Sequence, residues 1–399
     1  MRICIVTPGA LGSNPRVVKE AQTLSDHGHG VEVVCTRTLA AVDERDADIV
    51  AGAPWRTHRI DLSNPWAWRL RRLVQIANGE FSAFTGALTA KACAIPADLY
   101  IAHYPAALPA AAAAARKHGA AYAFDAEDFH PGDAPEAPRH DQERALIDAI
   151  ERRYLPDCAY VTAASPGIAE AYAQRYGVTL PTVVMNAFPK AKAPEAATSR
   201  GTALPGPSVY WFSQTLGPDR GLECAVEAIG QAKTRPHLYL RGLDQTGFAD
   251  VLRDRARKAG TEGQLHLLAP GQPSQMERLA AAYDMGFVGE TGCTPNRNIA
   301  LTNKQFTYLL AGLPVVMSNT PGHAAFARLA GKPVVLFGVD DAADLARAMD
   351  QVLGDPQHLA SLRALAYKLG QERFNWEAEQ AKLLACVDKI ISGSPSFRP

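Results

Sequence analysis

Residues 283–322 read YDMGFVGETGCTPNRNIALTNKQFTYLLAGLPVVMSNTPG, and this stretch decides the fold that the sequence predicts. Two short apolar runs in it, MGFV and PVVM, are typical of buried parallel strands. Between them lies the pattern of an amphipathic helix, which begins after a capping residue, Thr302 or Asn303, and ends at Gly312. The order strand, helix, strand predicts a parallel α/β unit in which the helix packs on the sheet.

The loop before this helix and the helix start predict an anion site. A polar loop as long as residues 290–301 is more often functional than idle in a compact α/β unit. The free N–H groups of a helix N-terminus suit a phosphate, and Lys304 adds a positive charge in the first turn, against the helix dipole. Thr307 shares a face with Lys304. The alternative for Lys304 taken alone is a solvated surface side chain.

The composition is that of an ordinary globular protein. The chain has 399 residues, enough for two or three domains, with 47% hydrophobic and 21% charged residues. Lys+Arg and Asp+Glu balance at 41 each, so no overall charge favours nucleic acid. The seven cysteines form no metal-ligand spacing and predict reduced thiols. The opening MRICIVTPGA lacks the features of a signal peptide, and no apolar run reaches the ~20 residues of a membrane span. We therefore expect a cytoplasmic protein.

The beginning of the chain predicts a strand, a glycine-bearing turn, a helix and a second strand. The helix has Pro15 at its first position and Ser13 or Asn14 as its cap. The turn contains Gly9 and Gly12, whose spacing does not match the dinucleotide-binding fingerprint. The two glycines bring the backbone close to whatever lies above the sheet, and a plain tight turn is the alternative.

A group of acids and imidazoles follows two further predicted strands in the first half. The strand ADLYIAHY ends near His103, and the strand AYAFDAEDFH opens into Asp125, Glu127, Asp128 and His130. Parallel sheets place their chemistry at such strand ends. A general base, a ligand for a sugar hydroxyl and a metal ligand are all compatible with these residues. The alternative is a set of solvated loop acids that cap the next helix.

A short basic and aromatic segment stands apart from this pattern. It contains Trp66, Trp68, Arg69, Arg71 and Arg72 within one predicted helix. A basic helix with tryptophans can lie on an anionic membrane surface or bind an acidic acceptor. An arginine-rich outer face over a tryptophan core contact is the simpler interpretation, since one short patch does not anchor a protein stably.

Alternating strand and helix patterns fill both halves of the chain, which predicts two doubly wound, Rossmann-like α/β domains that face a central cleft. We expect the first domain at residues 1–188, a linker rich in Ala, Pro and Lys at residues 189–207 and the second domain at residues 208–372. The final segment, residues 373–399, is expected to form a helix that packs back on the first domain.

Arg220 lies in the loop between the predicted strand VYWFS and the helix after it. Because the carboxyl ends of parallel strands meet at one edge, Arg220, Glu290 and Lys304 are expected at the same level of the second domain. An arginine and a lysine that converge there fit a diphosphate, which an arginine can hold through two hydrogen bonds. Each residue alone is also compatible with a surface charge.

Three motifs give the chain a resemblance to a known family. The opening ICIVTPGALGSNPRVVKEAQTLSDHGHGVEVVC, the segment FSQTLGPDRGLECAVEAI and the segment NKQFTYLLAGLPVVMSNTPG resemble the GT-B glycosyltransferases, in particular the large retaining group called family 4. The third motif is the most specific, and the resemblance spans nearly the whole chain. It implies that the first domain is on the acceptor side and that the second domain holds a nucleotide-sugar donor.

The resemblance also implies roles for individual residues. Arg220 and Lys304 would neutralise the diphosphate, and Gly9 or Gly12 would approach it from the first domain. Thr307 stands where many relatives carry a glutamate that binds the ribose. The position at which relatives often keep another arginine is Gln214 or Thr215 here, and Glu290 is the nearest match to the family's second acidic residue. Relatives often carry a histidine near DAEDFH that touches the transferred sugar; here a carboxylate, His130 or His103 would take that role.

The candidate residues fall into two sets. The candidates for binding the donor are Gly9, Gly12, Gln214, Arg220, Gly242, Glu290, Asn303, Lys304 and Thr307. The candidates for catalysis are Asp125, Glu127 and His103.

The implied function is transfer of a sugar from a nucleotide sugar to a saccharide or lipid-linked acceptor in cell-surface polysaccharide synthesis, without a metal. A nucleotide-sugar hydrolase or epimerase of the same fold and a non-catalytic two-domain binder of small molecules are the alternatives.

Overall fold

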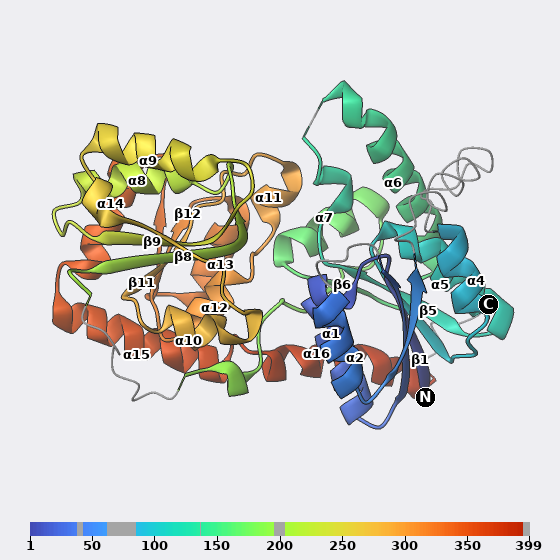
Figure 1. The fold of residues 1–399 in the computed structure, drawn as a ribbon. Helices are drawn as coiled ribbons and strands as arrows, with labels where there is room; N and C mark the ends of the chain where they lie inside the picture. Colours follow the sequence, from blue (N-terminus) through green and yellow to red (C-terminus); the bar gives the residue numbers. More distant parts are fainter. Residues whose placement is uncertain (38–42, 62–84, 136, 195–203, 394–399) are drawn as a thin grey trace. The chain divides into compact units, whose positions relative to one another are not determined.

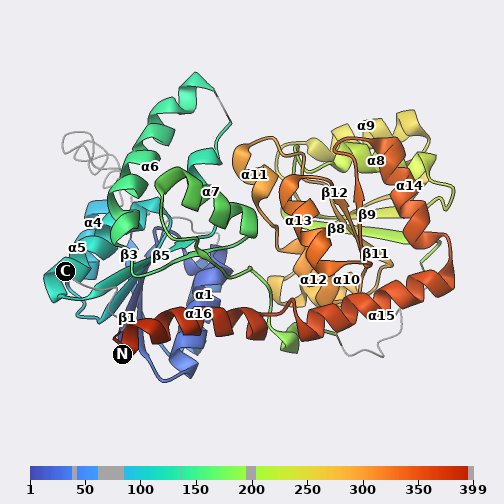
Figure 2. The same cartoon turned by 180° about the vertical axis from the view of Figure 1, so that it is seen from behind.

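The computed structural model describes residues 1–37, 43–61, 85–135, 137–194 and 204–393 (Figures 1 and 2). These residues form two compact units, which we describe separately. The first unit is Met1–Val184 with Gln380–Pro399, and the second unit is Met185–Glu379. The predicted tryptophan and arginine segment and part of the predicted linker lie outside the described residues. No helix among the described residues combines the length and the apolar character needed to cross a bilayer.

The first unit is built on a parallel sheet with the strand order β3-β2-β1-β4-β5-β6-β7. The central strands are almost wholly apolar and buried, as expected for strands covered on both faces. The order reverses between β1 and β4, which makes the carboxyl ends of these two strands the topological switch point of this unit. The strands are β1 (Arg2–Val6), β2 (Gly30–Arg37), β3 (Arg56–Asp61), β4 (Leu99–His103), β5 (Ala121–Ala126), β6 (Val161–Ala163) and β7 (Thr182–Val183).

Helices cover this sheet and complete its core. Asn14, one of the two predicted caps, caps α1 by accepting a hydrogen bond from Val17 N. Val17 packs with Ile3 of β1 and Val387 of α16 in one apolar cluster, so the last helix contributes to the core of the first unit. The α-helices of this unit are α1 (Pro15–Asp26), α2 (Asp43–Gly52), α4 (Thr85–Cys93), α5 (Leu108–His118), α6 (Asp141–Tyr154), α7 (Pro166–Tyr176) and the greater part of α16 (Trp376–Ile391).

The second unit repeats this architecture with the strand order β10-β9-β8-β11-β12-β13, again parallel throughout its described pairings. The order reverses between β8 and β11, so the switch point of this unit lies at their carboxyl ends. The strands are β8 (Ser208–Leu216), β9 (His237–Asp244), β10 (Leu265–Leu268), β11 (Met285–Val288), β12 (Val315–Ser318) and β13 (Val334–Phe337).

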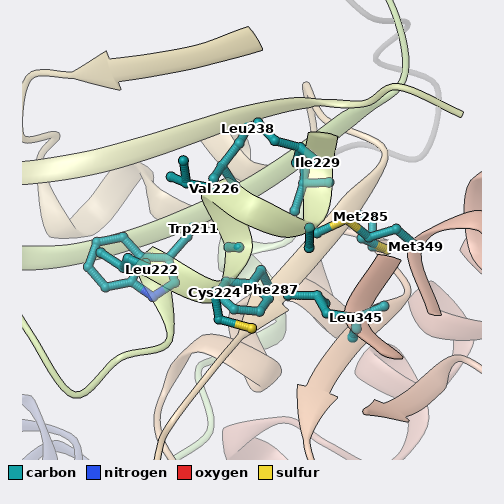
Figure 3. Packing of buried hydrophobic residues seen from close by; sticks show 14 of the residues in the cluster. Trp211, Leu222, Cys224, Val226, Ile229, Leu238, Met285, Phe287, Leu345 and Met349 are labelled. Carbon is teal, nitrogen blue, oxygen red and sulfur yellow. The ribbon is translucent and has the colours of Figure 1, made fainter. Parts of the chain in front are cut away.

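Two groups of helices pack on this sheet (Figure 1). The group α8, α9 and α14 packs together, as does the group α10, α12 and α15. Trp211 of β8, Leu222 of α8 and Phe287 of β11 belong to one apolar cluster, which packs between the sheet and the group α8, α9 and α14 (Figure 3). The helices are α8 (Leu222–Gln231), α9 (Phe248–Ala259), α10 (Met276–Ala280), α11 (Pro295–Ile299), α12 (Lys304–Leu310), α13 (Pro321–Ala330), α14 (Ala342–Leu353) and α15 (Pro356–Glu372).

The structure confirms the predicted α/β class and corrects several local predictions. Every residue of α12 is buried, so this helix is not amphipathic, and the Asn303 side chain does not cap it. The predicted loop at residues 290–301 contains α11, which Thr294 caps. β8 runs on to Leu216 through an irregularity in its pairing with β9, so Gln214 lies in a strand and not in a loop.

Close packing between β11 and α12 gives a first prediction. A Cβ atom on Gly286 would lie 2.3 Å from Tyr308 Cδ2, and Tyr308 is fully buried. We expect Gly286→Ala to lower the free energy of unfolding by about 1–3 kcal/mol, because a well-packed core resists added volume. Gly263→Ala in the same unit is the control: its Cβ would meet nothing within 4 Å, and we expect a change within about 0.5 kcal/mol. Urea unfolding measures both, and equal stabilities would contradict the packing described.

Candidate functional site

The switch point of the second unit gathers charged residues from three segments that are distant in sequence. Arg220 follows the end of β8, Glu290 follows the end of β11, and Lys304 begins α12. Ligands of open α/β sheets bind at such carboxyl-edge switch points, because the chain diverges there and leaves backbone and side chains facing outward. The predicted convergence of these three residues therefore has a structural basis.

Glu290 forms ion pairs with two cations of this cluster. Its Oε2 atom lies 2.5 Å from Arg297 Nη1, and its Oε1 atom lies 3.4 Å from Lys304 Nζ. Lys304 is only 7% exposed and Glu290 only 3%. The Lys304 ammonium also lies 5.5 Å from the centre of the Trp211 ring, within range of a cation–π contact. Arg220 donates from Nη1 to Ser213 Oγ at 3.1 Å, which directs its guanidinium along the end of β8.

The pKa shifts in the cluster follow from burial and from the mutual action of its charges. Burial alone would raise the pKa of Glu290, but Lys304, Arg297 and Arg220 outweigh it and hold that pKa below its ordinary value. Burial lowers the pKa of Lys304, and the repulsion from Arg220 and Arg297 adds to this against the attraction of Glu290. Burial likewise lowers the pKa of Arg220. A bound anion would relieve this repulsion and would stabilise the charged forms of all three cations.

Two contributors to this site were missed from the sequence. Arg297 belongs to α11, a five-residue helix hidden in a segment predicted as loop. His323 lies in the first turn of α13, where its Nδ1 is 2.8 Å from Ser318 O, while Ser318 donates to Glu290 O. Burial lowers the pKa of His323 to about 4, so its ring is neutral at pH 7. The sequence offered a signal for His323. Thr320-Pro321 follows a predicted strand and is typical of a helix start, which places the first turn of that helix at the carboxyl edge of the sheet.

Three other residues of the second unit were predicted to bind the nucleotide-sugar donor, and each has its own contacts. Thr307 is buried and donates to Glu277 Oε1 of α10 at 3.2 Å, so a carboxylate lies beside this hydroxyl. Gly242 lies in β9, and a Cβ atom there would lie 3.2 Å from Ser213 O of β8. The close approach of the two strands therefore explains why a residue without a side chain stands at this position. Gln214 is exposed on β8. A surface hollow of about 610 Å³ between α8 and α9 contains none of these residues.

In the first unit the two predicted glycines follow β1, but their amides are engaged. Gly9 N donates to Thr7 Oγ1 at 3.2 Å, and Gly12 N donates to Asp46 Oδ1 at 2.6 Å. These hydrogen bonds shape the turn within the unit. In this arrangement neither N–H group is directed to an outside ligand.

Asp125 and His103 lie in a buried network of ionic contacts. Arg16 holds Asp125 through two hydrogen bonds, from Nε at 2.6 Å and from Nη2 at 2.7 Å. His103 lies between two carboxylates, with Nε2 2.5 Å from Glu20 Oε2 and Nδ1 3.2 Å from Asp125 Oδ2. All four side chains are nearly inaccessible to solvent. Asp125 and His103, which were predicted as catalytic residues, therefore bind other buried side chains of the same unit.

The pKa values follow from these contacts. Burial opposes ionisation of Asp125, but Arg16 and His103 outweigh it and hold the pKa of Asp125 far below its ordinary value. Burial also opposes protonation of His103, but Glu20 and Asp125 outweigh it and raise the pKa of His103 to about 10. The imidazole is thus an imidazolium at pH 7.

Glu127 and His130 lie just beyond this network. Glu127 is half-buried, burial raises its pKa, and it accepts a hydrogen bond from Tyr104 Oη at 3.4 Å. His130 is 7% exposed, and burial lowers its pKa to about 4. Of the predicted catalytic residues, Glu127 is the one that retains solvent exposure.

Residues 12–187 match the family model described as "Glycosyl transferase 4-like domain". No curated protein sequence matches the chain. Among solved structures, Anabaena HepE (Alr3699) in complex with UDP-glucose superposes with a TM-score of 0.74 at 17% identity, covering 98% of this chain and 100% of that chain. The chain has the GT-B glycosyltransferase fold. The predicted fold class is confirmed by this likeness.

Two further structures share this fold. Sucrose-phosphate synthase from Thermosynechococcus elongatus has a TM-score of 0.76 at 16% identity and covers 99% of this chain and 100% of its own. The lipopolysaccharide outer core galactosyltransferase WaaB, in its apo form, has a TM-score of 0.63 at 13% identity and covers 98% of this chain and 99% of its own. At these identities the likeness concerns the fold.

The buried network of the first unit gives a prediction about pH. The pKa of His103 is about 10 in the folded protein and about 6.5 in an unfolded chain, so its stabilising effect is complete below pH ~6.5 and is lost as pH rises toward 10. We expect the free energy of unfolding to fall by a few kcal/mol over this range, on the order of 1.4 kcal/mol per pKa unit.

The variant His103→Gln tests this prediction, because it lacks the titrating group. Its unfolding free energy should change much less between pH 6.5 and pH 10 than that of the wild type. His27→Gln, at an exposed position of the same unit, is the control and should keep the wild-type slope. Parallel pH dependence in His103→Gln and wild type would show that His103 is not the group responsible.

Proposed function

We propose that this protein is a glycosyltransferase that moves a sugar from a nucleotide-sugar donor to a saccharide or lipid-linked acceptor. The observation that carries the proposal is the gathering of three cations at the switch point of the second unit. Arg220, Arg297 and Lys304 all act on the buried carboxylate of Glu290, and Asp219 acts on Arg220. Three cations at one edge of the sheet suit a diphosphate.

The likeness to known glycosyltransferases indicates which nucleotide sugars to test as donors. The match of residues 12–187 to a glycosyl transferase 4-like domain supports sugar transfer as the reaction class. The structure of Anabaena HepE is described as a complex with UDP-glucose, and the two chains share the GT-B fold. We therefore take UDP and UDP-sugars as the first ligands to test.

The proposed mechanism is electrostatic. When the bond between the sugar and the diphosphate breaks, negative charge develops on the leaving group, and fixed cations in a partly dry site stabilise it. Glu290 holds Lys304 and Arg297 in place before the ligand arrives, so little reorganisation is needed. We propose that these side chains meet the charge of the diphosphate and that no metal ion is required.

On the acceptor side, we propose Glu127 as the residue that contacts the sugar substrate. Its partial exposure at the carboxyl edge of the sheet supports this role. Asp125 and His103, which have no such exposure, would act as positioning residues that hold the ends of β4 and β5. We assign Gly9 and Gly12 a role in shaping the turn near this edge.

Three parts of the proposal rest on the sequence. Retention of configuration at the anomeric carbon and a role in cell-surface polysaccharide synthesis rest on the family resemblance. A cytoplasmic site of action with membrane contact rests on the composition, and the contact is assigned to Trp66, Trp68, Arg69, Arg71 and Arg72. Proton NMR of the first-formed product tests retention, since the anomeric coupling constant distinguishes the two outcomes.

The donor site yields a direct test. Lys304→Met keeps the length of the side chain and removes its charge. We expect this variant to bind UDP roughly 10- to 100-fold more weakly, because a hydrogen bond to a charged group contributes about 1.5–3 kcal/mol. Isothermal titration calorimetry measures the affinity, and circular dichroism verifies the fold.

Lys332→Met is the matched control. Lys332 is an exposed residue of the same unit, and the substitution changes the net charge equally. It should bind UDP as the wild type does. If Lys304→Met and Lys332→Met bind UDP with the same affinity as the wild type, the second unit does not hold the diphosphate at Lys304. Release of sugar from the donor without an acceptor would instead favour a hydrolase.

A further inference from the structure

Tyr104 has a backbone conformation that is unusual for its residue type. Its φ is 67° and its ψ is 150°, directly after β4 ends at His103. A bulky L-residue meets steric strain at positive φ, a region that favours glycine. Tyr104 also lies at the β1/β4 switch point of the first unit. Such strain persists where surrounding contacts enforce it, and it is concentrated at functional sites.

The side chain of Tyr104 reaches the residue proposed to contact the substrate. His103 and Asp125 are paired in register, so Tyr104 and Glu127 both follow the last paired residues of adjacent strands. Tyr104 Oη donates to Glu127 Oε2 at 3.4 Å, and the Tyr104 ring lies 5.5 Å from the His130 ring. Tyr104 and Glu127 are both half-buried, so this edge is partly open to solvent.

His130 adds an independent observation. Its Nε2 atom is buried and has no hydrogen-bond partner within the described part of the chain. Buried polar atoms are nearly always hydrogen-bonded in folded proteins. His130 Nε2 therefore has hydrogen-bonding capacity that the described residues do not use, as expected where a polar ligand binds.

We propose that Tyr104 is a positioning residue, whose strained backbone aims its hydroxyl at Glu127 so that this carboxylate meets a hydroxyl group of the sugar substrate. The identity of the ligand rests on the proposed function, whereas the coupling between Tyr104 and Glu127 does not. A tyrosine in a relaxed β conformation would direct its side chain elsewhere, because successive residues of a strand point to opposite faces.

The Tyr104 hydroxyl is expected to affect the pKa of Glu127. Burial raises the pKa of Glu127, and the neighbouring charges act in both directions. Burial also raises the pKa of Tyr104, so its hydroxyl remains a donor at neutral pH. A donor stabilises the ionised carboxylate, and its removal should raise the pKa of Glu127 further. The charged or titratable groups that act on Glu127 are Arg16 of α1, Asp125 of β5, Asp128 of the same loop, and His103 and Tyr104 at the end of β4.

The first experiment measures this coupling without any substrate. Carbon-13 NMR of protein labelled at glutamate carboxyls follows the titration of Glu127, which the variant Glu127→Gln assigns. In Tyr104→Phe, which keeps the ring and the backbone, the titration midpoint of Glu127 should rise by about half a pH unit or more. An unchanged or lowered midpoint would overturn the proposal.

The second experiment isolates the strain with a matched pair of variants. Tyr104→Ala and Tyr104→Gly both lose the ring and the hydroxyl, but only glycine adopts positive φ without strain. If the site enforces this conformation, Tyr104→Gly should unfold at a higher temperature than Tyr104→Ala. Equal melting temperatures, or a lower one for Tyr104→Gly, would show that the conformation is not enforced.

A transfer assay then links the coupling to function. In Tyr104→Phe the acidic limb of the kcat/KM profile should move to higher pH in step with the Glu127 midpoint, while the affinity for UDP should stay unchanged. A midpoint shift without any transfer activity would refute the proposed function and leave the coupling intact. Transfer with an unshifted profile would refute the role of Tyr104 and leave the proposed function standing.

Discussion

The ion pair between Lys304 and Glu290 is the contact on which the second unit's site depends. Both side chains are almost fully buried, and removing two charges from water is costly unless each finds a partner. Glu290 provides that partner for Lys304 and, through its other oxygen, for Arg297. The pair thus allows the Lys304 ammonium to be kept in a nearly dry environment at the edge of the sheet. There it would act on an anionic ligand more strongly than a surface charge would.

The two units each contain a cluster of charged side chains at the carboxyl edge of their sheet. In the first unit Arg16 and the His103 imidazolium face Glu20 and Asp125, so positive and negative charges balance in this network. Such a closed network fixes the ends of β4 and β5 relative to α1. In the second unit three cations, Arg220, Arg297 and Lys304, act together on the carboxylate of Glu290. We propose that the first network acts as a support and that the second cluster binds an anion.

The sequence predicted the parts of this arrangement that follow from periodicity and strand ends. Arg220, Glu290 and Lys304 were expected together because each follows or faces the carboxyl end of a strand, a rule that needs no tertiary contact. The cap at Asn14 followed from a local pattern. These features depend on residues that are close in sequence, so the sequence alone could indicate them.

Features that depend on distant partners could not be predicted in this way. The burial of every residue in α12 arises from packing between β11, α10 and α15. The amide of Gly12 is occupied by Asp46, a residue 34 positions away. Arg297 belongs to a helix too short to show a period, and the strained backbone of Tyr104 has no sequence signature.

The central claim is that the cationic cluster at the β8/β11 edge binds a diphosphate. The most direct measurement compares the affinities of the wild-type protein for uridine, UMP and UDP by calorimetry at low ionic strength and again at high ionic strength. The account predicts that UDP binds at least about tenfold more tightly than UMP, which corresponds to about 1.4 kcal/mol, and that the advantage shrinks as salt screens the charges. Equal affinities for uridine and UDP, independent of salt, would contradict it.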